Sequence, residues 1–166
     1  MKRWLICILV LLSSVTYGQV ADTSQPYYKR FPTVTPFQIL LSDSSTIYTR
    51  SHLPKNTPVA FLVFSPDCNH CQHEAEEIYS HREALKGIQI VMITMHSFES
   101  MKNFISKYKL NELSNVVVGR DIYYLMPAYY NFHNLPFHAL YNKEGRLLSV
   151  FEGEMNINTL IMVLKD

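Results

Sequence analysis

Two short apolar runs constrain the fold of this chain most: "PVAFLVFS" (Pro58 to Ser65) and "IQIVMITM" (Ile88 to Met95). Neither run alternates regularly between apolar and polar residues, which is the pattern of strands buried on both faces of a sheet. Between them lies "CQHEAEEIYSHREAL" (Cys71 to Leu85), whose residues favour a helix and whose acidic groups gather in its first turns. A strand, a helix and a second buried strand predict an α/β domain.

The flanking segments complete this pattern. Phe37 to Thr49 carries two β-prone runs around a Ser/Asp turn and predicts a leading hairpin. After the second buried strand, a helix is expected over "SFESMKNFISKYKL", with Ser97 as a suggested cap, and then a strand over "NVVVG". An aromatic helical segment follows over "IYYLMPAYYNFH", which Pro127 would kink or divide. Two strands over "FHALYNKEGRLLSVFEG", with a turn at Asn142–Gly145, precede a closing helix over "NINTLIMVLK" capped by Asn156 or Asn158. We expect a mixed central β-sheet flanked by helices, with an N-terminal β extension.

Residues 1–18 are predicted to be a secretory signal peptide. Lys2 and Arg3 precede an apolar run from Trp4 to Leu12, and small and polar residues follow up to a cleavage point near Gly18. The apolar run is shorter than the about 20 residues of a membrane span, so we expect no stable span in the mature chain. An uncleaved anchor and a buried N-terminal helix are the alternatives.

Composition bounds the rest of the chain. Residues 19–36 are polar and rich in proline, which indicates a linker or N-terminal arm, and residues 37–166 are expected to form one domain. Of the 166 residues, 48% are hydrophobic, which is enough to bury a core. The formal net charge is +1 without long runs of one sign, so no basic surface for nucleic acid is expected.

The cysteines are concentrated in one motif. Cys7 lies in the predicted signal, which leaves Cys68 and Cys71 in the mature protein. A disulfide that closes so small a loop restricts the unfolded chain little, so a structural staple is a weak interpretation. The pair begins the predicted helix, where free N–H groups and the positive end of the helix dipole stabilise a thiolate. Cys68 would present the outer sulfur, and Cys71, one turn further, would resolve a mixed disulfide.

A proline adds to this motif, because Pro136 directly precedes an apolar strand, a sheet position that tolerates proline. With it, residues 37–166 resemble the thioredoxin superfamily, in particular its exported TlpA/ResA-like branch, which is related to the AhpC/TSA group. The resemblance rests on "FSPDCNHCQHE", on "LP" before the hairpin, on "NKEGRLL" at its turn and on the order of elements. It implies a thioredoxin-like fold with Cys68 as nucleophile and Cys71 as resolving thiol. It also implies a cis peptide bond between Leu135 and Pro136 that packs against the disulfide and shapes a groove for the substrate chain.

Several positions depart from the pattern of that superfamily. Asp67 replaces a frequent Trp, Asn69 and His70 replace a frequent Gly-Pro, and Phe137 stands where Thr often follows the cis proline. Leu62 stands where thioredoxin carries a buried acid, so this position does not supply a group that transfers a proton. Glu74 is either that group, as in related C-x-x-C-x-x-E sequences, or an ordinary solvated acid.

His70 lies between the two cysteines, where an imidazole can donate to, or pair with, the Cys68 thiolate. Asp67 opposes this, since a neighbouring carboxylate disfavours the thiolate. We expect the helix dipole and His70 to outweigh Asp67, and the reduction potential to be less negative than the roughly −270 mV of thioredoxin. A solvated His70 without coupling to Cys68 is the alternative.

Three other functions stay open. Zinc or copper handling would use Cys68 and Cys71 with His70, His73 and His96, although no second paired motif is present. A non-catalytic binding module would use the aromatic run from Tyr123 to Phe132 as a partner surface, although such residues commonly pack around a helix. A thiol peroxidase would carry Thr three residues before its cysteine, where this chain has Ser65.

The residues and the resemblance together predict an exported thiol–disulfide oxidoreductase of the bacterial periplasm or cell envelope. Its partners would be protein disulfide or dithiol substrates and an upstream redox partner. No bound cofactor and no metal is expected. The direction of exchange depends on the redox partner, which the sequence does not identify.

Overall fold

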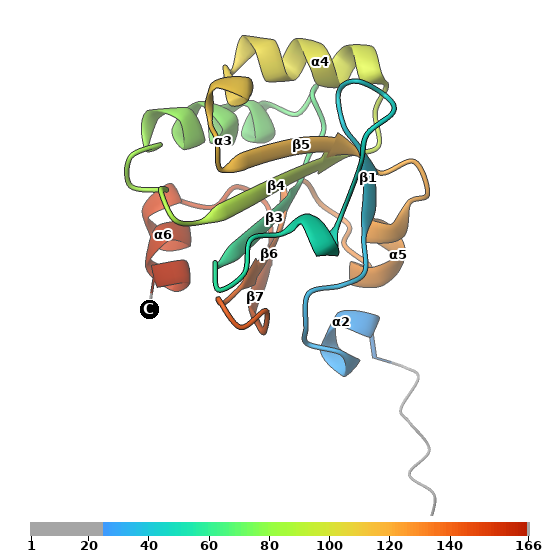
Figure 1. Cartoon of the computed structure of the whole chain (residues 1–166), viewed down its shortest axis with the longest axis vertical. Helices are drawn as coiled ribbons and strands as arrows, with labels where there is room; N and C mark the ends of the chain where they lie inside the picture. The colour runs from blue at the N-terminus through green and yellow to red at the C-terminus, as the bar shows by residue number, and fades with distance from the viewer. Residues whose placement is uncertain (1–24, 166) are drawn as a thin grey trace, which may run out of the picture.

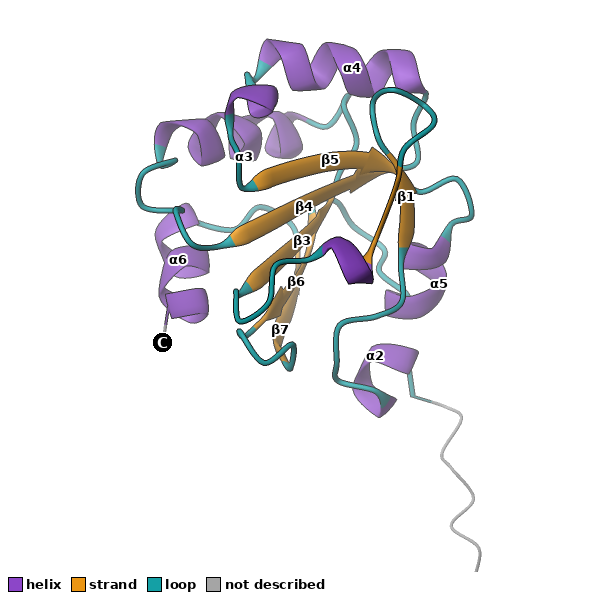
Figure 2. Ribbon diagram, viewed as in Figure 1, coloured by secondary structure: helices purple, strands orange, loops and turns teal. Residues whose placement is uncertain are grey.

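The structure, a computed structural model, describes residues 25–165. Its strands are β1 (Gln38–Leu40), β2 (Ile47–Thr49), β3 (Val59–Val63), β4 (Gln89–Thr94), β5 (Val116–Arg120), β6 (Phe137–Tyr141) and β7 (Leu147–Glu152). Its helices are α2 (Tyr27–Arg30), α3 (Asn69–Ser80), α4 (Phe98–Lys107), α5 (Leu125–Tyr130) and α6 (Ile157–Lys165), with 3-10 turns η1 (Arg50–His52) and η2 (Leu110–Glu112). Figure 2 shows the strands side by side, with helices around them.

The strands form one mixed sheet in the order β2-β1-β5-β4-β3-β6-β7. At its centre β3 pairs in parallel with β4 and antiparallel with β6, and every residue of these three strands is buried. Strands covered on both faces need apolar side chains at successive positions, which explains the consecutive apolar residues in the two runs. The leading hairpin is present as antiparallel β1 and β2, with β1 joined to β5. The predicted mixed sheet with an N-terminal β extension is confirmed.

Helices cover the two faces of the sheet unequally. Side chains from α3, α4 and α6 share one buried cluster with Leu62, Met92 and Leu140. The alternate residues of the same strands, such as Phe61 and Val91, face a second cluster with α5 and the residues before β1. Figure 1 shows the same division, with α3, α4 and α6 on one side of the sheet and α5 with α2 on the other.

Two of the helix caps predicted from the sequence are present in the structure. The side chain of Ser97 accepts the Ser100 N–H at 3.1 Å and caps α4, and Asn156 Oδ1 accepts the Asn158 N–H at 2.9 Å at the start of α6. The prediction that Pro127 would kink or divide a longer helix was wrong. Because α5 begins only at Leu125, Pro127 lies in its first turn, where its missing N–H has no intrahelical partner to lose.

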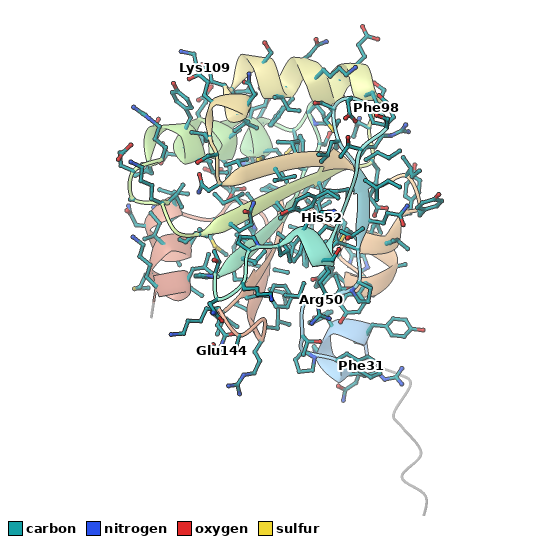
Figure 3. All side chains as sticks on the ribbon, viewed as in Figure 1. Phe31, Arg50, His52, Phe98, Lys109 and Glu144 are labelled. Carbon is teal, nitrogen blue, oxygen red and sulfur yellow. The ribbon has the colours of Figure 1, made fainter. Side chains whose placement is uncertain are left out.

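The segment that the sequence indicated as a linker packs on the domain over its described part. Tyr28 approaches Tyr130 with ring centroids 5.8 Å apart, Thr33 forms a β-bridge to Arg146, and Val34 is buried. Phe31, labelled in Figure 3, lies exposed at the end of α2, at the opposite end of the view from Phe98 of α4. The predicted signal peptide lies outside the described residues. Within residues 25–165, no helix is both long and apolar enough to cross a membrane.

Candidate active site around Cys68

Cys68 is the N-cap residue of α3. Its backbone is extended (φ −87°, ψ 120°), and its sulfur accepts the Cys71 N–H at 3.4 Å. A cap whose acceptor is sulfur uses one of the free N–H groups of the helix start to stabilise negative charge on that atom. Cys68 is partly exposed and Cys71 is buried, and both are free thiols. The order that the sequence predicted, an accessible sulfur over a buried one, is therefore present.

The segment before β6 closes the other side of Cys68. The Leu135–Pro136 peptide bond is cis, and the Cys68 Sγ lies 3.9 Å from the Leu135 carbonyl oxygen. Leu135 is half-buried and Pro136 is buried. The two residues that the resemblance assigned to a substrate groove thus lie beside the outer sulfur, with the Leu135 carbonyl directed at it.

Cys71 lies under Cys68 in the apolar cluster, only 1% exposed. Burial, and then the hydrogen bond with Cys68, raises the pKa of the Cys71 thiol above its ordinary value, and the charge of Glu74 adds to the rise. Cys71 is therefore a protonated thiol at neutral pH. To attack a disulfide it must first lose its proton to another group.

Glu74 is 2% exposed and is not a solvated first-turn acid. Its Oε1 lies 2.6 Å from Nε2 of His138, a residue of β6 that is fully buried. Cys71 and Glu74 are three residues apart in α3 and therefore share one face of the helix. Sequence reasoning missed His138, because no local spacing connects it with the cysteines.

His70 and His73 both point to Glu154, which lies between β7 and α6. His70 Nδ1 is 2.6 Å from one carboxylate oxygen, and His73 Nδ1 is 2.7 Å from the other. Hydrogen bonds from His70 and then His73 hold the pKa of Glu154 below its ordinary value. Glu154, another residue that the sequence did not indicate, is thus the hydrogen-bond partner of His70 in the described part of the chain.

Three other residues that the sequence analysis named, Asp67, His96 and Phe137, lie around this site and differ in their exposure and contacts. Asp67 is exposed, and its N–H donates to Ser65 Oγ at 3.3 Å. His96 Nε2 lies 3.1 Å from the same hydroxyl oxygen. Phe137 packs in the second cluster against Phe132, with ring centroids 4.7 Å apart. Among residues 25–165, no group of three or more Cys, His, Asp or Glu side chains is arranged to hold a metal ion.

Comparisons with known proteins place this geometry in a fold class. No family model and no curated protein matches the chain. Solved structures do match it. A secreted Mycobacterium tuberculosis disulfide oxidoreductase homologous to E. coli DsbE is 21% identical, with a TM-score of 0.64 over 76% of this chain and 92% of that one. A thioredoxin-family thiol:disulfide interchange protein from Chlorobium tepidum is 15% identical, with a TM-score of 0.67 over 85% of this chain and 95% of that one.

A peroxiredoxin-like protein from Aquifex aeolicus is similar too, 17% identical with a TM-score of 0.61 over 80% of this chain and 84% of that one. At such identities the likeness establishes the fold, and the chain has the thioredoxin-like fold that its sequence predicted.

Proposed function

We propose that this chain is an exported thiol–disulfide oxidoreductase that exchanges disulfides with protein substrates through Cys68 and Cys71. The observation that carries the proposal is the position of the Cys68 sulfur. It accepts an N–H bond at the start of α3, lies 3.4 Å from the Cys71 nitrogen, and faces the Leu135 carbonyl at 3.9 Å. A partly exposed sulfur held between a helix N-terminus and the backbone carbonyl of Leu135 suits attack on a disulfide in an extended chain.

The chemistry proceeds in two exchanges. The Cys68 thiolate attacks one sulfur of a substrate disulfide, forms a mixed disulfide, and releases the other substrate sulfur as a thiolate that takes up a proton. Cys71 then loses its proton, and its thiolate attacks the Cys68 sulfur. The Cys68–Cys71 disulfide forms, and the second substrate thiolate leaves. The substrate gains two electrons and the protein loses two, while the reverse steps insert a disulfide.

Glu74 is the group proposed to accept the Cys71 proton, because it is the buried carboxyl on the same face of α3. Leu135 and Pro136 are proposed to align the substrate backbone beside Cys68. The proposed location is the bacterial periplasm or cell envelope, which agrees with the charged and apolar start of the chain. Disulfide chemistry persists in such compartments. An upstream redox partner would restore the dithiol or the disulfide after each turnover.

A trapping experiment tests the proposal. With Cys71→Ser the second exchange is blocked, so the protein should accumulate as a mixed disulfide with its substrate when expressed with its native leader in a bacterial host. Addition of dithiothreitol should release the captured protein. The matched control is the double variant Cys68→Ser/Cys71→Ser, which keeps the fold but lacks the nucleophile. Equal capture by the two variants would refute the proposal, as would the failure of wild-type protein to form an internal disulfide with oxidised glutathione.

A further inference from the structure

A buried pair of titratable groups, Glu74 and His138, lies beneath the cysteines. The two side chains are 2% and 0% exposed, and their Oε1 and Nε2 atoms are 2.6 Å apart. They come from different elements, α3 and β6, and are 64 residues apart in the sequence. Burying two such polar groups costs free energy unless each finds a partner. Their contact is therefore a specific arrangement rather than a by-product of packing.

The register of the sheet explains why His138 reaches this place. His138 pairs directly with Leu62 across β6 and β3, so the two side chains project from the same face of the sheet. That face packs against α3 through Leu62, Cys71 and Ala75. Leu62 is the position at which the sequence lacks a buried acid. The ionisable groups on this face are thus His138, from the neighbouring strand β6 at the level of Leu62, and Glu74, from the helix α3 that covers the face.

The protonation of the pair follows from the remaining atoms. Within the described chain, His138 Nδ1 and Glu74 Oε2 are buried and have no hydrogen-bond partner. An imidazolium would bury a second, unpaired N–H, whereas a neutral ring protonated at Nε2 leaves only an unpaired acceptor at Nδ1. The tautomer with its proton on Nε2 is therefore the one that can donate to Glu74 Oε1 without burying a second, unpaired N–H. The second carboxylate oxygen of Glu74, Oε2, then accepts no hydrogen bond from the described residues.

We propose that His138 is a positioning residue for the resolving step, and that it acts through Glu74 on Cys71. The Nε2–H bond fixes the rotamer of the carboxylate, so that the free Oε2 accepts the Cys71 proton. The step balances: the S–H bond of Cys71 breaks, an O–H bond forms on Glu74, and the Cys71 thiolate displaces the leaving sulfur from Cys68. His138 neither gains nor loses a proton. This inference rests on the proposed dithiol exchange.

The test separates the two exchanges with one reagent, 5,5′-dithiobis(2-nitrobenzoate), added in equimolar amount to reduced full-length protein. Attack by Cys68 releases one thionitrobenzoate, and attack by Cys71 on the resulting mixed disulfide releases the second. Leucine at position 138 fills similar space but cannot donate. In His138→Leu the first release should stay within twofold of wild type, and the second should slow by about tenfold to a hundredfold, the range expected for losing a hydrogen bond to a charged group.

Two further variants distinguish positioning from structural support. Gln carries a donor nitrogen at the same number of bonds from Cβ as His Nε2, so His138→Gln should restore most of the second release. In a Glu74→Gln background, His138→Leu should add less than twofold, because its effect passes through the carboxylate. His81→Leu, an imidazole at the far end of α3, is the control.

Three results would overturn the inference: an unaffected second release in His138→Leu, a His138→Gln variant as slow as His138→Leu, or additive effects with Glu74→Gln. If His138→Leu does not fold, the inference is decided by the rate of the second release in His138→Gln, measured with Glu74 and with Glu74→Gln. A wild-type protein that releases only one thionitrobenzoate would instead refute the dithiol function itself, so the two failures are distinguishable.

Discussion

Glu154 holds the imidazole of His70 at 2.6 Å, although His70 stands between the two cysteines. The same carboxylate also binds His73, so the first turn of α3 is tied to the segment between β7 and α6. The sequence suggested that His70 would act directly on the Cys68 thiolate. In the structure its Nδ1 atom is already engaged by the Glu154 carboxylate, so this nitrogen is not free to pair with the neighbouring sulfur.

The first prediction concerns this contact. Glu154→Gln removes a negative charge near the helix start and frees His70, and both changes favour the Cys68 thiolate. The reduced form is then stabilised, and the reduction potential should become less negative. Equilibration of the variant and the wild type with glutathione at pH 7 measures the shift. Glu76→Gln, an exposed change of the same charge on α3, should shift the potential less; an equal shift would show that net charge alone is responsible.

The second prediction concerns pH and the buried thiol. The pKa of Cys71 is raised above its ordinary value of 9.0, chiefly by burial. A group whose pKa is higher in the folded state contributes stability below its unfolded pKa and loses it as the pH rises. The reduced protein should therefore lose stability above pH 9, with a slope of at most about 1.4 kcal/mol per pH unit for one thiol. Denaturant unfolding from pH 8 to 10.5 measures it.

The matched control for that prediction is Cys71→Ala, which removes the thiol and should reduce the slope between pH 9 and 10.5; the slope that remains near pH 10 belongs to buried Tyr130 and Tyr141, whose pKa values burial also raises. In the same pH range iodoacetamide should modify Cys68 well before Cys71. Equal rates of modification at the two cysteines would contradict the burial and the pKa direction of Cys71.

The sequence predicted the site where local spacing defines it, and it could not predict the rest. Cys68, Cys71 and Glu74 lie within two turns of one helix, so their proximity follows from helical geometry. His138 and Glu154 reach the same place through strand register and the path after β7, neither of which leaves a local pattern. Leu62 offered the one indirect signal: a missing acid on β3 invites a search of its cross-strand partner, but that partner is known only once the register of β6 is known.

The fold shows the same limit. The strands β3 and β4 were predicted to within about two residues, because burial on both faces imposes several consecutive apolar residues. The segment around Pro127 was predicted as a longer helix because its aromatic residues resemble a helix face. Residues before Leu125 instead form the loop that Asp121 organises, and nothing in the spacing of the tyrosines distinguishes loop from helix.

The third prediction concerns that loop. Asp121 is 1% exposed, and its carboxylate accepts the Tyr123 N–H at 3.2 Å and the Met126 N–H at 2.8 Å. Asp121→Ala leaves both N–H groups without this acceptor and should lower the free energy of unfolding by about 1–2 kcal/mol. Asp121→Asn keeps one acceptor oxygen and should cost less. Urea denaturation of the three proteins measures the order, and an Asn variant as unstable as the Ala variant would contradict it.

The fourth prediction concerns the close approach of β1 to β5. A Cβ added at Gly119 would lie 2.7 Å from Ile39 Cδ1, too close for real atoms. Gly119→Ala should therefore destabilise the protein by about 1–3 kcal/mol through overpacking. In an Ile39→Ala background the same change should cost less, because the Cδ1 and Cγ1 atoms of Ile39 are gone and only its Cβ, 3.0 Å from the added methyl group, remains. A double-mutant cycle from denaturant unfolding gives the coupling, and simple additivity would show that another contact excludes the methyl group.

The central place of β3 affects how the protein opens. The strand lies between β4 and β6, and all of its residues are buried, while β2 forms one rim of the sheet and β7 the other, next to which Thr33 bridges to Arg146. Amide protons of such inner strands exchange with solvent only in the rarest, most global openings, whereas rim segments breathe often. The loop that carries Cys68 directly follows β3, so we expect the anchor of this sulfur to lie in the slowest-exchanging part of the molecule.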